Sequence, residues 1–563
     1  MKPERRSPSV RARDCAGSLS PRASVRARFH AKWLLSLAML GSGIVASSCF
    51  TGSDGLVPPT ENLYFPTGAL VSPGRTTLYV VNSDFDLQFN GGTVQALNLA
   101  ATGDHDGLRD IADRVATAIA NGDSPDDTCG SIGSTPNDNL SLYPGPCNPI
   151  DVQPFIRAFA TVGAFAAGIT LLSRDDGEPG ARLFVSVRGD PSVTYFDVPD
   201  DRDPGQVESP CAPDLFCLQC AGEGDEQRCG RDHRIGENIF TSQRGLLLPT
   251  EPTSVASSLG SGSDPVIAAH QTSATASLVV NSWPVDGDAT PFSATPSLEF
   301  LLEGLPEAPT VVTSIPAPAF AKDASFDYQP GFIISHRADN TLTVVRYFDD
   351  ANAAPSRPFL VRSDDIGLSI SGADTDSRGM AFDTTARTAC EAGCADDRAC
   401  LEQCLDEKVG FYVANREPPS LLIGQMETTP NETDGEVTSL SETFSFEEAI
   451  PLPLGPALVF VGQVINLDGE LEPRVFVVCF DSRFVVVYDP TLRKVEAQIR
   501  TGRGPFGLAF DTGTNADGEP TSYMYVTQFT DSYLSVVDLD MSRLSYLTPI
   551  VSFGPPQPPR EEQ

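Results

Sequence analysis

Short runs of apolar, β-branched and aromatic residues, each pair separated by a polar break of a few residues, recur along this chain. The clearest two are VFVVCFDSRFVVVYD and YMYVTQFTDSYLSVVDL, within 474–547. Such paired runs are typical of antiparallel strands joined by a short turn. The pattern occurs seven times, at 78–99, 183–198, 266–283, 332–348, 411–426, 475–489 and 523–539.

A short segment of small residues precedes the strand pairs, as in GALVSPG, AAGITLLS, PTSVASS, RGMAFD, PALVFVG and PFGLAFD; PTVVTSIPAPAF stands before the fourth pair. A four-stranded unit cannot bury both of its faces alone, so it stacks on copies of itself. The sequence therefore predicts an all-β fold, a seven-bladed β-propeller of four-stranded antiparallel blades spanning 66–553. A many-stranded sandwich is the alternative, but it does not explain the repeated inner strand.

Three insertions interrupt the repeats. With the strands of a blade lettered A to D from the axis outward, residues 100–153 fall between C and D of blade 1, 199–242 between C and D of blade 2, and 384–409 between A and B of blade 5. The first insertion includes an amphipathic helix predicted over 107–120. Because A–B and C–D loops leave a four-stranded meander on the same side, all three insertions are expected on one face of the propeller.

The phrases LVSPGRTTLYVVN and GPFGLAFD…YMYVTQ resemble the YVTN-repeat, lactonase-like seven-bladed propellers. The resemblance covers most of 66–553 and implies the same fold. It also implies an alternative function, that of a lactonase-like hydrolase with its site at the mouth of the central channel. Fold alone does not carry an activity across such a superfold.

The N-terminal segment 1–48 is predicted to be an export signal. Nine Lys or Arg residues precede the apolar run WLLSLAMLGSGIVA, which leads to Ser47, Ser48 and Cys49. This ending resembles a bacterial lipobox, so we expect lipidation of Cys49 and a lipoprotein anchored in the bacterial cell envelope, in the outer membrane and facing the periplasm or the exterior. Ordinary signal cleavage is the alternative. Residues 49–65 are expected to be a linker that could supply a closing strand, and 554–563 a Pro-rich tail.

The charge of the chain bears on nucleic-acid binding, and its cysteine content agrees with export. Nine of the 39 basic and two of the 75 acidic residues fall in the signal, so the remainder carries 30 bases against 73 acids, which disfavours nucleic-acid binding. The cysteines after Cys49 form local groups that predict structural disulfides, with Cys479 left as a buried thiol. The groups are Cys129 and Cys147; Cys211, Cys217, Cys220 and Cys229; and Cys390, Cys394, Cys400 and Cys404.

The last group allows a specific prediction. Its members are spaced so that each pair lies on one helical face, which favours two short antiparallel helices stapled as Cys390–Cys404 and Cys394–Cys400. Zinc is the functional alternative for this group, and the Cys217-x2-Cys220 pair could be redox-active or half a zinc site.

Alignment of the seven copies gives the candidate site. The residues that end strand B are expected to ring the channel mouth on the face without insertions, as a default binding site. They are Asn82, Arg188, His270, His336, Asn415, Phe480 followed by Asp481, and Gln528. His270 and His336 could hold a divalent metal or act as a general base, and Arg188 could hold an anion. The structural alternative is that these side chains satisfy turn backbone.

The sequence therefore favours an exported, membrane-anchored binding or scaffold module over an enzyme. The expected partners are the membrane, through the lipid anchor, and a protein or small-molecule ligand. No nucleophile elbow, phosphate loop or metalloprotease motif occurs in a usable context.

Overall fold

The computed structural model describes residues 55–101, 106–174, 179–203, 215–222, 224, 227–260, 263–283, 294–322, 328–349, 357–368, 375–395, 397–434, 436–514 and 518–555. The expected export signal, Cys49 and Cys211 lie outside these residues. The fold below is that of the compact unit that starts at Gly55. Among the helices of the described residues, none has the length and apolarity needed to cross a bilayer.

Seven four-stranded antiparallel sheets follow one another along the chain, each built from consecutive strands. Blades 1 to 3 contain β1 Pro66–Val71, β2 Thr77–Asn82, β3 Gly92–Asn98, β4 Ile156–Val162; β5 Ala166–Ser173, β6 Ala181–Val187, β7 Ser192–Val198, β8 Arg234–Ile235; and β9 Pro252–Ser257, β10 Asp264–His270, β11 Thr275–Asn281, β12 Ser297–Glu303. Blades 4 and 5 contain β13 Pro309–Ser314, β14 Gly331–His336, β15 Thr341–Phe348, β16 Phe359–Gly367; and β17 Ser377–Asp383, β18 Val409–Arg416, β19 Pro419–Thr433, β20 Glu436–Pro451. Blades 6 and 7 contain β21 Pro456–Ile465, β22 Leu471–Cys479, β23 Phe484–Asp489, β24 Lys494–Arg500; and β25 Pro505–Thr514, β26 Pro520–Gln528, β27 Tyr533–Asp538, β28 Pro549–Phe553.

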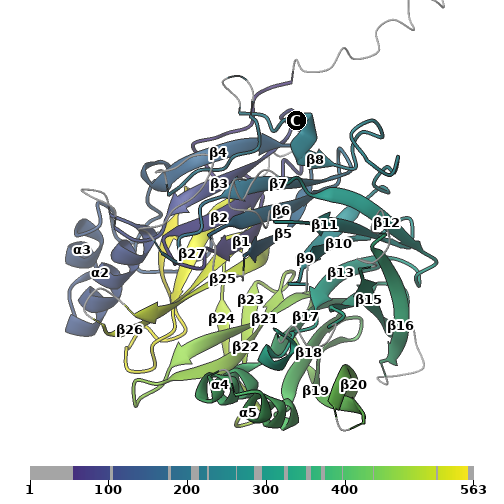
Figure 1. Cartoon of the computed structure of the whole chain (residues 1–563). Helices are drawn as coiled ribbons and strands as arrows, with labels where there is room; N and C mark the ends of the chain where they lie inside the picture. Colours follow the sequence, from purple (N-terminus) through teal and green to yellow (C-terminus); the bar gives the residue numbers. More distant parts are fainter. Residues whose placement is uncertain are drawn as a thin grey trace, which may run out of the picture. The chain divides into compact units, whose positions relative to one another are not determined.

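The blades form a closed ring (Figure 1). The inner strands β1, β5, β9, β13, β17, β21 and β25 contact one another in that order, and β25 contacts β1. The predicted seven-bladed propeller is confirmed, and each predicted strand pair corresponds to the two middle strands of a blade. The described part of the expected closing segment, 55–65, adds no strand to any of the seven sheets.

Glycine explains the recurring inner-strand motif. Gly68, Gly168, Gly379 and Gly507 occupy the same place in their strands, where the inner strand of the next blade passes close by. A Cβ at Gly379 would lie 2.4 Å from Leu458 Cα, and one at Gly507 would lie 3.0 Å from Gly68 Cα. The absence of a side chain therefore lets neighbouring inner strands approach around the axis.

Middle strands are almost wholly buried because blades stack face to face. In β2, β6, β10 and β14 every residue is buried, as is every residue of β26 after Pro520, and separate apolar clusters fill the spaces between consecutive blades. Outer strands are more exposed, as in β16 and β20. The core is therefore a circle of inter-blade layers.

The insertion of blade 1 holds the predicted helix, α2 Leu108–Asn121, with α3 Pro125–Gly130 and the 3-10 turn η1 Gln153–Phe155 after it. Its apolar face joins the cluster between blades 1 and 7. Ile150 pairs with Phe553 of β28, and the carboxylate of Asp511 in β25 accepts bonds from Arg75 (2.6 Å) and Arg109 (2.5 Å). The insertion thus bridges the junction where the ring closes; we call residues 106–153 the latch.

The insertion of blade 2 is shorter than expected. The outer strand β8, of two residues only, lies inside the predicted 199–242, next to the 3-10 turn η2 Arg231–His233. The insertion therefore ends before Arg234. Between Pro309 of β13 and Gly331 of β14, blade 4 adds the turn η3 Ala319–Lys322.

Disulfides hold the insertions as predicted. Cys129–Cys147, Cys220–Cys229, Cys390–Cys404 and Cys394–Cys400 are bonded, Cys217 is disulfide-bonded as well, and Cys479 is a buried free thiol. In blade 5 the last two bridges staple α4 Thr385–Cys394 to α5 Arg398–Gln403 and the turn η4 Cys404–Asp406. The Cys390–Cys404 and Cys394–Cys400 pairing matches the prediction from helical spacing.

Candidate binding surface at the channel mouth

Strand pairing defines seven equivalent positions at the ends of the second strands. In every blade, the residue there pairs with the first residue of the inner strand. These residues are Asn82, Val187, His270, His336, Asn415, Cys479 and Gln528. Five agree with the expected ring. Arg188 and Asp481 differ, because Val187 and Cys479 occupy the equivalent places in blades 2 and 6.

The polar members of this ring are closed off from solvent. Asn82 is 1% exposed, and His270, His336, Asn415 and Gln528 are 0% exposed. They therefore do not line an open mouth.

Instead, most of these side chains bond to the third strand of their own blade. His270 Nε2 lies 2.7 Å from Ser277 Oγ, His336 Nε2 lies 3.0 Å from Thr343 Oγ1, and Gln528 Nε2 lies 3.3 Å from Ser535 Oγ. Burial lowers the pKa of both histidines to about 4, so the rings are neutral at neutral pH. The ring thus braces the blade ends, chiefly through hydroxyl groups of the third strand.

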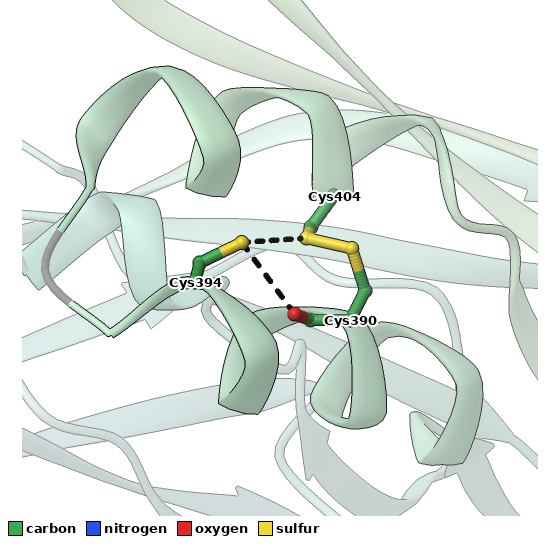
Figure 2. Close-up of side chains that lie close together, drawn as sticks. All are labelled: Cys390, Cys394 and Cys404. Atoms are coloured by element: carbon green, nitrogen blue, oxygen red, sulfur yellow. Dashed lines mark hydrogen bonds between the residues drawn. A yellow bond between two sulfur atoms is a disulfide. The ribbon is translucent and has the colours of Figure 1, made fainter.

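The structure does not group the two histidines with further metal ligands. Among the described residues, one set of three side chains has metal-ligand spacing, namely Cys390, Cys394 and Cys404. Figure 2 shows why that set is structural: Cys390 and Cys404 share a disulfide, and the Cys394 sulfur lies 3.5 Å from that of Cys404. Cys394 is itself bonded to Cys400, so none of the three offers a thiolate to zinc.

The residue that follows each ring position reaches the mouth. In every blade its amide N–H donates to the carbonyl of the residue just before the inner strand, at 2.8–3.3 Å. We call these seven the mouth positions: Ser83, Arg188, Gln271, Arg337, Arg416, Phe480 and Phe529. Arginines occupy blades 2, 4 and 5, and phenylalanines blades 6 and 7.

Four arginines form the cationic side of the mouth, and we call them the arginine arc: Arg188, Arg337, Arg378 and Arg416. Arg188 pairs with Glu251, and Arg416 Nη2 lies 2.7 Å from Asp481 Oδ2. Arg378 and Arg337 share one carboxylate, with Asp376 Oδ1 at 2.5 and 3.7 Å from their Nε atoms. Four guanidinium groups thus meet three carboxylates.

Mutual repulsion among these guanidinium groups is evident at Arg337. Burial, followed by the charges of Arg378, Arg416 and Arg188, lowers its pKa, while Asp376 opposes the shift. The side chain is still 40% exposed. An anion bound here would offset a repulsion that the protein leaves partly uncompensated.

Five phenylalanines form the other side of the mouth, and we call them the phenylalanine cluster: Phe85, Phe165, Phe480, Phe506 and Phe529. They come from blades 1, 2, 6 and 7. Phe85 lies 5.8 Å from Phe165 and 5.2 Å from Phe529 between ring centroids, and Phe480 lies 6.1 Å from Phe529. Phe85 is 51% exposed, and the neighbouring Leu87 is 59% exposed. An exposed apolar patch beside converging charges is a feature of binding surfaces.

Sequence reasoning missed this cluster. The signal was available: Phe480 and Phe529 stand at equivalent places directly after the second strands of the two clearest repeats. The alignment instead places Phe480 in a ring whose other members are polar. Phe85 gave no such signal, because the loop of blade 1 between β2 and β3 is longer than its counterparts.

No family model matches this chain, and no curated protein matches it. Solved structures with a similar fold include hydrazine synthase of Kuenenia stuttgartiensis, with a TM-score of 0.39, 11% identity and coverage of 87% of this chain and 98% of that one. Saccharomyces cerevisiae Sqt1 has a TM-score of 0.38 and 8% identity, with 86% and 84% covered. BBS1N, solved in complex with ARL6DN, has a TM-score of 0.34 and 12% identity, with 71% and 84% covered. At these values the likeness carries no argument about activity.

Proposed function

We propose that this protein is an exported binding module whose channel mouth takes an acidic peptide segment bearing a large apolar side chain. The observation that carries the proposal is the placement of the arginine arc and the phenylalanine cluster around one mouth, with three arginines and two phenylalanines at equivalent positions of their blades. Carboxylates of the segment would meet Arg188, Arg337 and Arg416, and its apolar side chain would cover Phe85.

The energetics favour such a ligand. The whole chain has a formal net charge of −36, so a locally cationic surface is an exception to its overall field. Guanidinium groups bind carboxylates with two parallel hydrogen bonds, and aromatic side chains are enriched in the cores of interfaces. A free anion would gain only the hydrogen bonds to guanidinium groups. A peptide segment that carries carboxylates and a large apolar side chain would gain the contacts with aromatic rings as well.

Export and anchoring belong to the same proposal. Their support is the signal-like segment 1–48, the lipobox-like residues before Cys49, and the described disulfides, which suit an oxidising compartment. Kinship with the YVTN-repeat, lactonase-like propellers rests on the repeat motifs. The lactonase-like hydrolase gains no support from the histidines, because His270 and His336 are buried and bonded to hydroxyl groups.

The test is fluorescence anisotropy of a labelled synthetic peptide that alternates Glu and Phe. The same peptide with Lys in place of Glu is the control ligand. We expect the acidic peptide to bind and its affinity to fall with rising salt. The double variant Arg337→Ala, Arg416→Ala should weaken binding about tenfold or more, and Phe85→Ser should weaken it independently of salt.

Arg244→Ala is the matched control variant, since Arg244 also forms an ion pair, with Glu299 in blade 3, 2.6 Å away, but lies outside the mouth. Equal binding of both peptides, or equal binding by the double variant and the parent, would rule out the mouth as the site.

A further inference from the structure

A second cavity lies between blades 5 and 6, on the face that bears the insertions. It has a volume of about 250 Å³ and is lined by β18, β19 and β20 of blade 5 and by the link after β23 of blade 6. Its position beside Asp383 and Lys408, at the two ends of the stapled insertion, places it on the side of the ring opposite to the mouth positions. It is therefore separate from the proposed peptide site and does not rest on it.

Tyr412 supplies an unused hydroxyl group to this cavity. The residue is 4% exposed, and in the part of the chain that the structure describes its hydroxyl group makes no hydrogen bond. The oxygen lies over Gly410, where a Cβ would come within 2.9 Å of it. The ring packs beside that of Tyr488, with centroids 6.3 Å apart. The hydroxyl group of Tyr488, which also lines the cavity, is buried without a partner among the described residues, and this costs free energy unless a bound molecule satisfies it.

The charged groups around the cavity form ion pairs, with more carboxylates than cations. Lys408 Nζ lies 2.8 Å from a carboxylate oxygen of Glu427, and Arg493 binds Glu447 at 2.8 Å and Glu448 at 3.1 Å. With Asp383 included, these groups comprise two more carboxylates than cations, so the cavity disfavours an inorganic anion.

The remaining walls provide both donors and acceptors. Asp383 Oδ1 accepts from the amide of Thr385 at 3.0 Å, which leaves its other oxygen available, and Gln425 contributes an amide. Ile423 and Pro490 are among the few apolar contacts.

We propose that this cavity binds a single neutral sugar ring of hexose size. A sugar presents hydroxyl groups that both donate and accept, and C–H groups that pack on aromatic rings, which matches Tyr412, Asp383 and Gln425. The cavity is smaller than the ~300–1,000 Å³ typical of drug-sized ligands, so one ring fits and an extended chain does not.

The experiment is saturation-transfer difference NMR on the folded protein with glucose, galactose, mannose and N-acetylglucosamine, followed by titration of the strongest binder. Tyr412→Phe removes the hydroxyl group and no protein hydrogen bond, so it should fold as the parent does and weaken sugar binding about tenfold. Gln425→Ala should weaken binding as well.

Tyr525→Phe is the matched control. The hydroxyl group of Tyr525 is buried without a partner among the described residues, as that of Tyr488 is, but the residue belongs to blade 7. It should leave sugar binding unchanged. The proposal is overturned if none of the four sugars gives a signal, if Tyr412→Phe and Tyr525→Phe bind equally, or if inorganic phosphate displaces the sugar.

Discussion

His270 and His336 are buried as neutral side chains, which makes the stability of the fold depend on pH. Their pKa of about 4 in the folded protein lies below the ordinary value of 6.5, because burial disfavours the charged ring. As the pH falls from 6.5 towards 4, the unfolded chain takes up protons that the folded chain refuses. The stability that each neutral histidine side chain contributes is therefore complete above pH 6.5 and is lost as the pH falls towards 4.

The equivalent positions in other blades suggest the substitution that tests this. Gln528 Nε2 contacts the hydroxyl group of Ser535 at the place where His270 Nε2 contacts that of Ser277, and the Ser hydroxyl group can donate or accept. We expect the double variant His270→Gln, His336→Gln to match the parent in stability at pH 7.5 within about 1 kcal/mol. It should be more stable than the parent at pH 4.5, by up to about 3 kcal/mol for each ring replaced.

Guanidinium chloride unfolding at the two pH values measures the difference. Parallel losses of stability in parent and variant would show that other groups govern the acid response.

The residues of the mouth could be predicted only in part. The strand pairs locate the turn, but each inner strand contains an irregularity near its start, as between Ala166 and Ile169 or Pro456 and Leu458. A shift of one residue moves a side chain from the interior to the mouth. The prediction placed the polar residues Arg188 and Asp481 in the ring. In the structure the equivalent buried positions hold Val187 and Cys479.

At the scale of single elements, the stapled helices of blade 5 show how an insertion can be stabilised locally. Cys394 and Cys404 are buried, and Leu405 packs with Phe320, Tyr328 and Val437 in a small cluster apart from the main core. The staple therefore joins an element that also has its own apolar contacts.

Replacing one bridge at a time by serine should separate the two contributions. Loss of Cys390–Cys404, which closes the longer loop, should cost about 2–3 kcal/mol of local stability, and loss of Cys394–Cys400 about 0.5–1 kcal/mol less. Hydrogen exchange of the α4 and α5 amides is the appropriate measurement, because the blades should stay folded in both variants. Unchanged protection in Cys390→Ser, Cys404→Ser would mean that the apolar cluster alone holds the helices.

Elements differ in how well their sequence reveals them. Middle strands were predictable, since burial on both faces produces continuous apolar runs such as those of β22 and β26. The strand β8 was not, because two residues carry no periodicity. The helix α2 was predictable from its amphipathic pattern, although the pattern did not reveal that its apolar face would pack against blade 7.

At the scale of the whole molecule, the ring closes through the junction of blades 7 and 1. Asp511 of β25 is fully buried and binds both Arg75 of blade 1 and Arg109 of the latch. Replacing one partner of a buried ion pair leaves charge uncompensated, which is far costlier than losing a surface pair.

Asp511→Asn should therefore destabilise the protein by about 3 kcal/mol and loosen this junction first. Asp106→Asn is the control: Asp106 also pairs with an arginine near α2, Arg114, but both side chains are about half exposed, so the expected loss is about 0–1 kcal/mol. Denaturant unfolding gives the two free energies, and hydrogen exchange at β28 reports the junction. Equal effects of the two substitutions would contradict a closing role for Asp511.

The latch helps to close the ring, although it belongs to no blade. Every blade is a continuous piece of chain, so no strand of one end is woven into a sheet of the other. The ring is closed by contacts of β25 with β1 and by residues that belong to no blade, through Ile150 beside β28 and α2 beside blade 7. A circular permutant could therefore begin and end at the link between any two blades without dividing a sheet. In a permutant whose blades 7 and 1 are covalently joined, the latch would no longer be needed to hold these two blades together.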